Sequence, residues 1–200
     1  MRRSTLLAAV LRLAILAAAT GASAQMNSPM TSQNKPARDA GDAVAKPVGM
    51  ASATTLGSFT DSAFVQNAAR GDMFEIRSSK LAEEKSSSPE IKKFAAQMIT
   101  AHTQTTVGLK AAIAEGHVKT PVPTKLDARR QGMLDNLRAS HGGEFDKRYV
   151  AQQIAAHQET LDLMKGYADH GHNDALKAAA AKTAPLVQDH LDMAKALPGA

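Results

Sequence analysis

The sequence predicts an all-α protein, a four-helix bundle whose long crossover contains a short fifth helix. Apolar residues recur at spacings of three and four along four long segments, which is the period of an amphipathic helix. Helix-starting and helix-ending residues bound each of these segments. The strict alternation of apolar and polar residues that is typical of strands appears nowhere along the chain.

The first two helices are expected to form an antiparallel pair. The first begins at Thr60 or Asp61, either of which can cap free backbone amides, and runs to about Lys85. The second covers 88–114, where Ser88 is the cap and a proline occupies the first turn. Only a tight reversal separates them. Their inner faces are Phe64, Ala68, Gly71, Glu75, Ser78 and Ala82, and then Ile91, Ala95, Met98, His102, Thr105, Leu109 and Ala112.

The remaining helices follow a connection that two prolines keep extended. A short helix is expected over about 126–139, ended by Gly142 and Gly143, and longer helices over about 144–169 and 174–197. A long crossover between two helix hairpins is the ferritin-like connection rather than the simple up-and-down one. The inner faces of the long helices are Val150, Ile154, His157, Leu161, Met164 and Ala168, and then Leu176, Ala180, Thr183, Val187, His190 and Ala194.

Residues 1–24 have the three parts of a secretory signal peptide: two early arginines, an alanine- and leucine-rich stretch, and the closing Ala22-Ser23-Ala24. A retained membrane anchor is the less favoured alternative, because the apolar run is short for a span of about 20 residues. We therefore expect a periplasmic chain with no transmembrane segment after signal removal. Residues 25–58 show no sustained period and predict a flexible linker, which leaves 59–200 as the helical domain.

Charge and cysteine content exclude several classes of protein. The net charge is +5, but Arg2, Arg3 and Arg12 lie in the predicted signal peptide, which has no acidic residue. The rest of the chain is close to neutral and poor in aromatic residues, so we expect no nucleic-acid binding. The absence of cysteine excludes disulfides and a lipid-modified cysteine. No feature of the sequence identifies a protein partner.

Each long helix places one ionisable residue on its inner face, and these are Glu75, His102, His157 and His190. A buried carboxylate or imidazole without a partner is costly, whereas a cation would satisfy all four groups at once. The set predicts a site for a single divalent metal ion, with zinc, iron and manganese as candidates. The spacing of Asp72 and Gln153 lets them reach Glu75 and His157, so we expect these two side chains to contact the ligands on the side away from the metal ion.

Alternatives to this metal site stay open. The four groups could hydrogen-bond only to each other, as a structural polar layer in a non-catalytic envelope or stress-related interaction protein. Met98 and Met193 lie within a turn of inward histidines, as at copper(I) or haem sites, although methionine is more often core filler. No nucleophile and base pair, phosphate loop or cofactor fingerprint is visible, so we assign no catalytic residue and leave open whether the protein is an enzyme.

Four ordered segments, GDMFEIRSSKLAEEK, FAAQMITAHT, GGEFDKRYVAQQIAAHQETL and APLVQDHLDMAKAL, resemble a bacterial exported family of unknown function. Its members are often labelled "predicted outer membrane protein", and their domain is ferritin-like. The resemblance covers about 59–197 and implies that the recurring glutamate and three histidines of the family fall on Glu75, His102, His157 and His190. Ala101 departs from the family, which often has an acidic residue there.

A carboxylate-bridged di-iron centre is not expected. Ferritin-type centres use a Glu-x-x-His pair on two helices and a glutamate on each of the others. The residue three positions before His102 is Ile99, and the residue three before His190 is Val187. The glutamate expected on the third long helix is replaced by His157.

Overall fold

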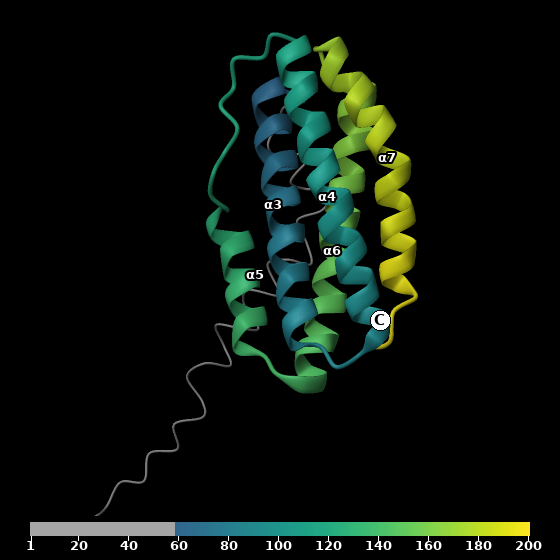
Figure 1. Cartoon of the computed structure of the whole chain (residues 1–200). Coiled ribbons are helices and arrows are strands. Elements are labelled where there is room, and N and C mark those ends of the chain that lie inside the picture. Colours follow the sequence, from purple (N-terminus) through teal and green to yellow (C-terminus); the bar gives the residue numbers. More distant parts are fainter. Residues whose placement is uncertain (1–58) are drawn as a thin grey trace, which may run out of the picture. The chain divides into compact units, whose positions relative to one another are not determined.

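The computed structural model describes residues 59–200, and these residues form five helices and no strand (Figure 1). The helices are α3 (Asp61–Lys85), α4 (Pro89–Glu115), α5 (Ala128–Ala139), α6 (Gly142–His170) and α7 (Asp174–Lys195). The all-α class is thereby confirmed. None of these five helices combines the length and the apolar character that crossing a bilayer requires. The predicted signal peptide at 1–24 and linker at 25–58 lie outside the described residues.

Side-chain caps fix the starts of four helices at the positions that the sequence indicates. The side chains of Thr60, Ser88, Asp127 and Asn173 each accept a hydrogen bond from the backbone N–H three residues later, at 2.8 to 3.3 Å. Each bond satisfies one of the amides that a helix start leaves free. These short polar residues therefore determine where α3, α4, α5 and α7 begin.

Two boundaries differ from the sequence prediction. Gly142 does not end the short helix but begins α6, and its φ of +54° is a left-handed conformation that glycine adopts without strain. The short helix ends at Ala139, as the sequence predicts, and the Ser140 hydroxyl after it donates to the carbonyl oxygen of Asn136. The last helix ends at Lys195 rather than 197, since Leu197 precedes a proline and is disfavoured in helical geometry.

The four long helices form a ring of contacts in which each packs against two others (Figure 1). The pairs are α3 with α4, α4 with α7, α7 with α6, and α6 with α3. The short helix α5 packs against α3 and α6. Helices that are distant in the sequence are therefore side by side, and side chains from α4, α6 and α7 can meet inside the ring.

The two larger apolar clusters of buried side chains have a polar layer between them along the helices, and a third, small cluster contains Phe74 and Met133. One cluster includes Phe64 and Tyr167, whose rings stack with their centroids 4.0 Å apart. The other includes Ile91, Phe94 and Phe145. Along α3, α4 and α6 the ionisable residue on the inner face lies between the segments that supply these two clusters. Glu75, His102 and His157 are thus held far from the ends of their helices.

A network of largely buried ion pairs joins α5 to α6. Both carboxylate oxygens of Glu159 accept hydrogen bonds from Arg129, at 2.7 and 2.6 Å, and one also accepts from Arg130 at 2.8 Å. Arg130 pairs in addition with Asp127, the residue that caps α5. Glu159 is 8% exposed, so its charge depends on these two guanidinium groups.

Candidate metal centre

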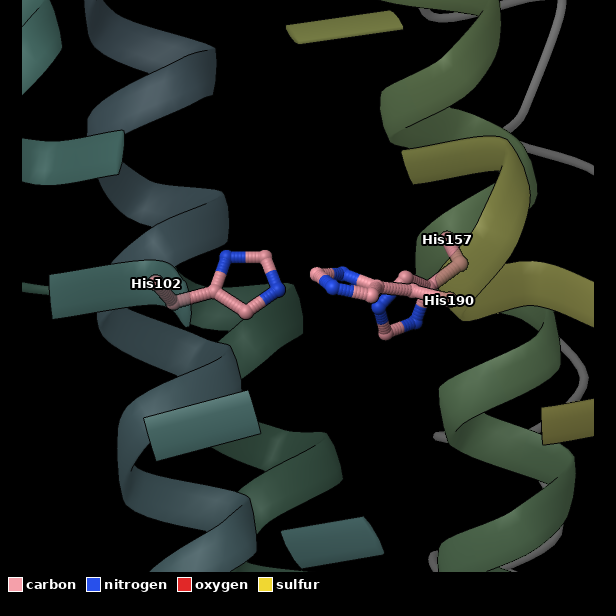
Figure 2. A group of neighbouring side chains, drawn as sticks. All are labelled: His102, His157 and His190. Carbon is pink, nitrogen blue, oxygen red and sulfur yellow. The ribbon is translucent and has the colours of Figure 1, made fainter. Parts of the chain in front are cut away.

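Three histidines from three helices meet in the polar layer: His102 of α4, His157 of α6 and His190 of α7 (Figure 2). Their ring centroids are 5.6, 5.7 and 5.6 Å apart, which makes the triangle nearly equilateral. One nitrogen of each ring lies within 4.8 Å of the corresponding nitrogens of the other two. Figure 2 shows the His102 ring turned toward the other two rings across the space between the helices.

Each of the three rings has one buried nitrogen that makes no hydrogen bond within the part of the chain described. Nδ1 of His157 lies 2.8 Å from the carbonyl oxygen of Gln153, which can only accept, so Nδ1 carries the proton and Nε2 has a free lone pair. Nε2 of His102 and Nδ1 of His190 likewise have no partner. Buried polar atoms rarely stay unsatisfied, and three converging imidazole nitrogens fit the donor set of a transition metal ion.

Asp72 orients His102. One oxygen of its carboxylate accepts hydrogen bonds from Nδ1 of His102 at 2.9 Å and from the Thr105 hydroxyl at 2.8 Å. The other accepts from the Thr106 hydroxyl at 2.9 Å. From the sequence, Asp72 is expected beside Glu75, and no role at the site is expected for either threonine, although both lie about one turn after His102 on the same helix face. A carboxylate behind a ligand histidine is the usual arrangement at metal sites.

Glu75 flanks the three histidines but is not part of the group whose ligand atoms converge. It is 2% exposed, and its Oε1 lies 3.9 Å from Nδ1 of His157. Burial raises the pKa of the Glu75 carboxyl to about 7, although the charge of His102 acts in the opposite direction. Near neutral pH this carboxyl is therefore close to its midpoint of ionisation.

Gln153 contacts two elements of the polar layer. Its backbone carbonyl accepts the His157 hydrogen bond, and its side-chain amide donates to the Ser78 hydroxyl of α3 at 3.2 Å. The sequence prediction placed Gln153 behind His157, and the backbone rather than the side chain makes that contact. Of the two methionines considered above, Met98 packs in the cluster with Ile91 and Phe94, and Met193 is 36% exposed.

The histidines differ in how readily they take a proton. Burial lowers the pKa of His157 to about 3 and that of His190 to about 4, and the positive charge of His102 adds to both effects. Burial also acts to lower the pKa of His102, but the hydrogen bond with Asp72 and the charge of Glu75 outweigh it, so that pKa is raised. At neutral pH, His157 and His190 are therefore neutral and keep the lone pairs that a cation needs.

The Glu75→Gln variant is expected to be more stable than the wild type above pH 7, in the absence of any ligand. A carboxyl whose pKa rises from 4.5 to about 7 on folding contributes stability that is full below pH 4.5 and is lost as the pH rises through 7. The uncharged amide avoids this loss, which amounts to at most about 3 kcal/mol. Urea unfolding at pH 8 and pH 5 measures the free energy of unfolding of both proteins. The variant should be more stable than the wild type at pH 8, and this difference should shrink at pH 5. An equal difference at the two pH values would contradict the prediction.

Comparison with known proteins places this all-helical chain, with its three buried histidines, in a family of unknown function. The chain belongs to the family described as "Domain of unknown function (DUF4142)", whose model matches residues 45–197. The match begins inside the predicted linker. No curated protein matches the chain.

The chain is also similar to a particular solved structure, that of "CopM in the Cu(II)-bound form". The two share 20% sequence identity with a TM-score of 0.57, over 68% of this chain and 93% of the CopM chain. At this identity the similarity shows a shared fold.

Proposed function

We propose that this protein is an exported, ferritin-like four-helix bundle that binds one divalent transition metal ion through His102, His157 and His190. One observation carries the proposal: histidines from three helices each offer one ring nitrogen within 4.8 Å of those of the other two. Each of these rings also has a buried nitrogen without a hydrogen-bond partner in the described residues. A cation coordinated by all three would remove the cost of burying them unsatisfied.

The bundle part of the proposal rests on the ring of contacts among α3, α4, α6 and α7. The connection from α4 to α6 contains α5 and is much longer than the turns within the two hairpins, α3–α4 and α6–α7. A single long crossover between two hairpins is the ferritin-like arrangement. Export rests on the predicted signal peptide at 1–24.

The donor set narrows the choice of metal. Imidazole nitrogens suit copper, zinc and iron, whereas manganese prefers oxygen donors. Copper(II) also forms the strongest complexes among the divalent ions of this series. The CopM structure of similar fold was solved with Cu(II), and this supports adding copper(II) to zinc and iron as the ions to test first. With no carboxylate among the three converging donors, the proposed site differs from a carboxylate-bridged di-iron centre.

Glu75 has a separate role in this proposal. Its carboxylate, 3.9 Å from His157, supplies a negative charge that offsets part of the charge of the bound cation. Asp72 supplies a second negative charge behind His102. A dication surrounded by three neutral imidazoles and two carboxylates is close to neutral overall, which lowers the cost of holding it inside the protein.

The test is a metal titration of the purified chain after treatment with a chelator. Elemental analysis should find about one equivalent of copper or zinc per chain, and copper should displace zinc and iron. Manganese should bind most weakly. If none of these ions binds above background and the chelator leaves the melting temperature unchanged, the histidines form the structural polar layer of the competing hypothesis.

The Asp72→Asn variant is expected to bind the metal ion about 10- to 100-fold more weakly than the wild type, while it keeps one site. An asparagine oxygen can still accept from His102, but the charge that stabilises the coordinated ring is lost, and the amide group cannot accept from Thr106. Competition with a chromophoric chelator measures the affinity. Asp192→Asn is the matched control, because Asp192 is exposed on α7 and should give wild-type affinity.

A further inference from the structure

A cavity of about 560 Å³ lies mainly between α4 and α7 and reaches the histidine cluster. Exposed residues of both helices line it, among them Gly108 of α4 and Ala178 of α7. His102, which is 3% exposed, and His190 also line it, whereas His157 and Glu75 do not. The cavity therefore leads from the surface to one side of the cluster.

We propose that a small, mostly apolar molecule with one neutral donor atom enters this cavity and binds directly to the metal ion. This inference rests on the proposed metal site. Three protein donors leave at least one coordination position for an outside ligand, as they do at catalytic zinc sites. Since His102 and His190 line the cavity and His157 does not, the open position faces the cavity.

The lining determines the chemical class of the ligand. Most of the wall consists of alanine, leucine, valine, phenylalanine and methionine side chains, which favour an apolar body. Seven of the residues of α4 and α7 that line the cavity are alanine or glycine, whose small side chains help to keep the space open. Asp72 also lines the cavity but is already occupied by hydrogen bonds from His102, Thr105 and Thr106.

Charge argues for a neutral donor. The carboxylates of Asp72 and Glu75 already lie beside the cluster and together balance a dication. An anionic donor would add an unbalanced negative charge, because the other two charged side chains that line the cavity, Glu115 and Lys182, offset each other. A nitrogen heterocycle with an apolar substituent has both required properties, and 4-phenylimidazole is therefore a suitable probe.

Gly108 offers a way to close the cavity without disturbing the cluster. A Cβ atom built at Gly108 meets no atom within 4 Å, and the residue has ordinary helical geometry. Gly132 of α5 is a helical glycine with equally open surroundings and does not line the cavity. Gly108→Phe is thus the blocking variant, Gly108→Ala the variant that keeps the cavity open, and Gly132→Phe the matched control.

The experiment adds 4-phenylimidazole to each protein loaded with one equivalent of Cu(II) and records the electron paramagnetic resonance and visible spectra. We expect a saturable spectral change in the wild type, in Gly108→Ala and in Gly132→Phe. Gly108→Phe should bind the probe at least tenfold more weakly while it binds Cu(II) as the wild type does. Metal content is measured again after gel filtration, and copper should remain on the protein.

Three results would overturn the inference but leave the proposed function intact: no spectral change in the copper-loaded wild type, equal probe affinity in Gly108→Phe and Gly132→Phe, or extraction of copper by the probe. A wild type that takes up none of the ions copper(II), zinc and iron would overturn both. Metal titration without the probe separates the two failures.

Discussion

Replacing His102 with alanine is expected to abolish the thermal stabilisation that Cu(II) or Zn(II) gives the wild-type chain. A ligand that binds only the folded state at a free concentration about 1,000 times its dissociation constant stabilises that state by about 4 kcal/mol. For a chain of this size each kcal/mol corresponds to about 2–4 °C, so the melting temperature should rise by roughly 10 °C. The loss of one of three donors should reduce this shift to nearly zero.

The comparison uses the shift in melting temperature on adding metal, measured by circular dichroism, because removing the His102 ring also changes the stability of the metal-free protein. His172→Ala is the control, since His172 is exposed in the turn between α6 and α7. It should keep the full shift. A shift of equal size in His102→Ala and wild type would mean that the ion binds elsewhere.

The Glu159→Ala variant is expected to lower the free energy of unfolding by about 3 kcal/mol, independently of metal. Glu159 is the common acceptor for Arg129 and Arg130, and its removal leaves two largely buried guanidinium groups without their main partner. Urea denaturation measures the loss. Because the network joins α5 to α6, hydrogen exchange should also become faster in α5 than in α4 or α7.

Asp135→Ala provides the comparison for this ion network. Asp135 pairs with Arg138 within the same short helix, and the two side chains are 58% and 50% exposed. Exposed pairs of this kind contribute little, so the variant should unfold close to the wild type. Equal losses in the two variants would show that the buried ion pairs of Glu159 contribute no more to stability than the exposed pair of Asp135 does.

Most of the helical architecture follows from local signals in the sequence. Caps such as Ser88 and Asn173 and the spacing of apolar residues place helix starts and inner faces directly. The start of α6 was misplaced because Gly142 takes a left-handed conformation, and glycine can equally end a helix or precede one. Helix periodicity does not encode which helices are neighbours, and the ring of contacts comes from the structure.

At the candidate site, too, the sequence predicts some features and only the structure shows the others. The inward direction of His102 and His157 is predictable from spacing, and both are buried. The partner of Asp72 was not predictable, because a residue on α3 can face either the following helix or the interior, and only side-chain geometry selects His102 over Glu75. The sequence predicts a ligand role for Glu75, His102, His157 and His190 and a supporting role for Asp72 and Gln153, and these roles stay predictions for metal titration to test.

The three histidines lie on three different helices, α4, α6 and α7, and this determines whether metal binding can come before the completion of folding. Neighbouring helix positions such as i and i+4 could capture an ion on a single helix, but these three residues approach one another only after α7 docks against α4 and α6. Before that, the chain presents isolated imidazoles with weak affinity. Loading with metal would therefore follow the completion of folding, in whichever compartment the last helix docks.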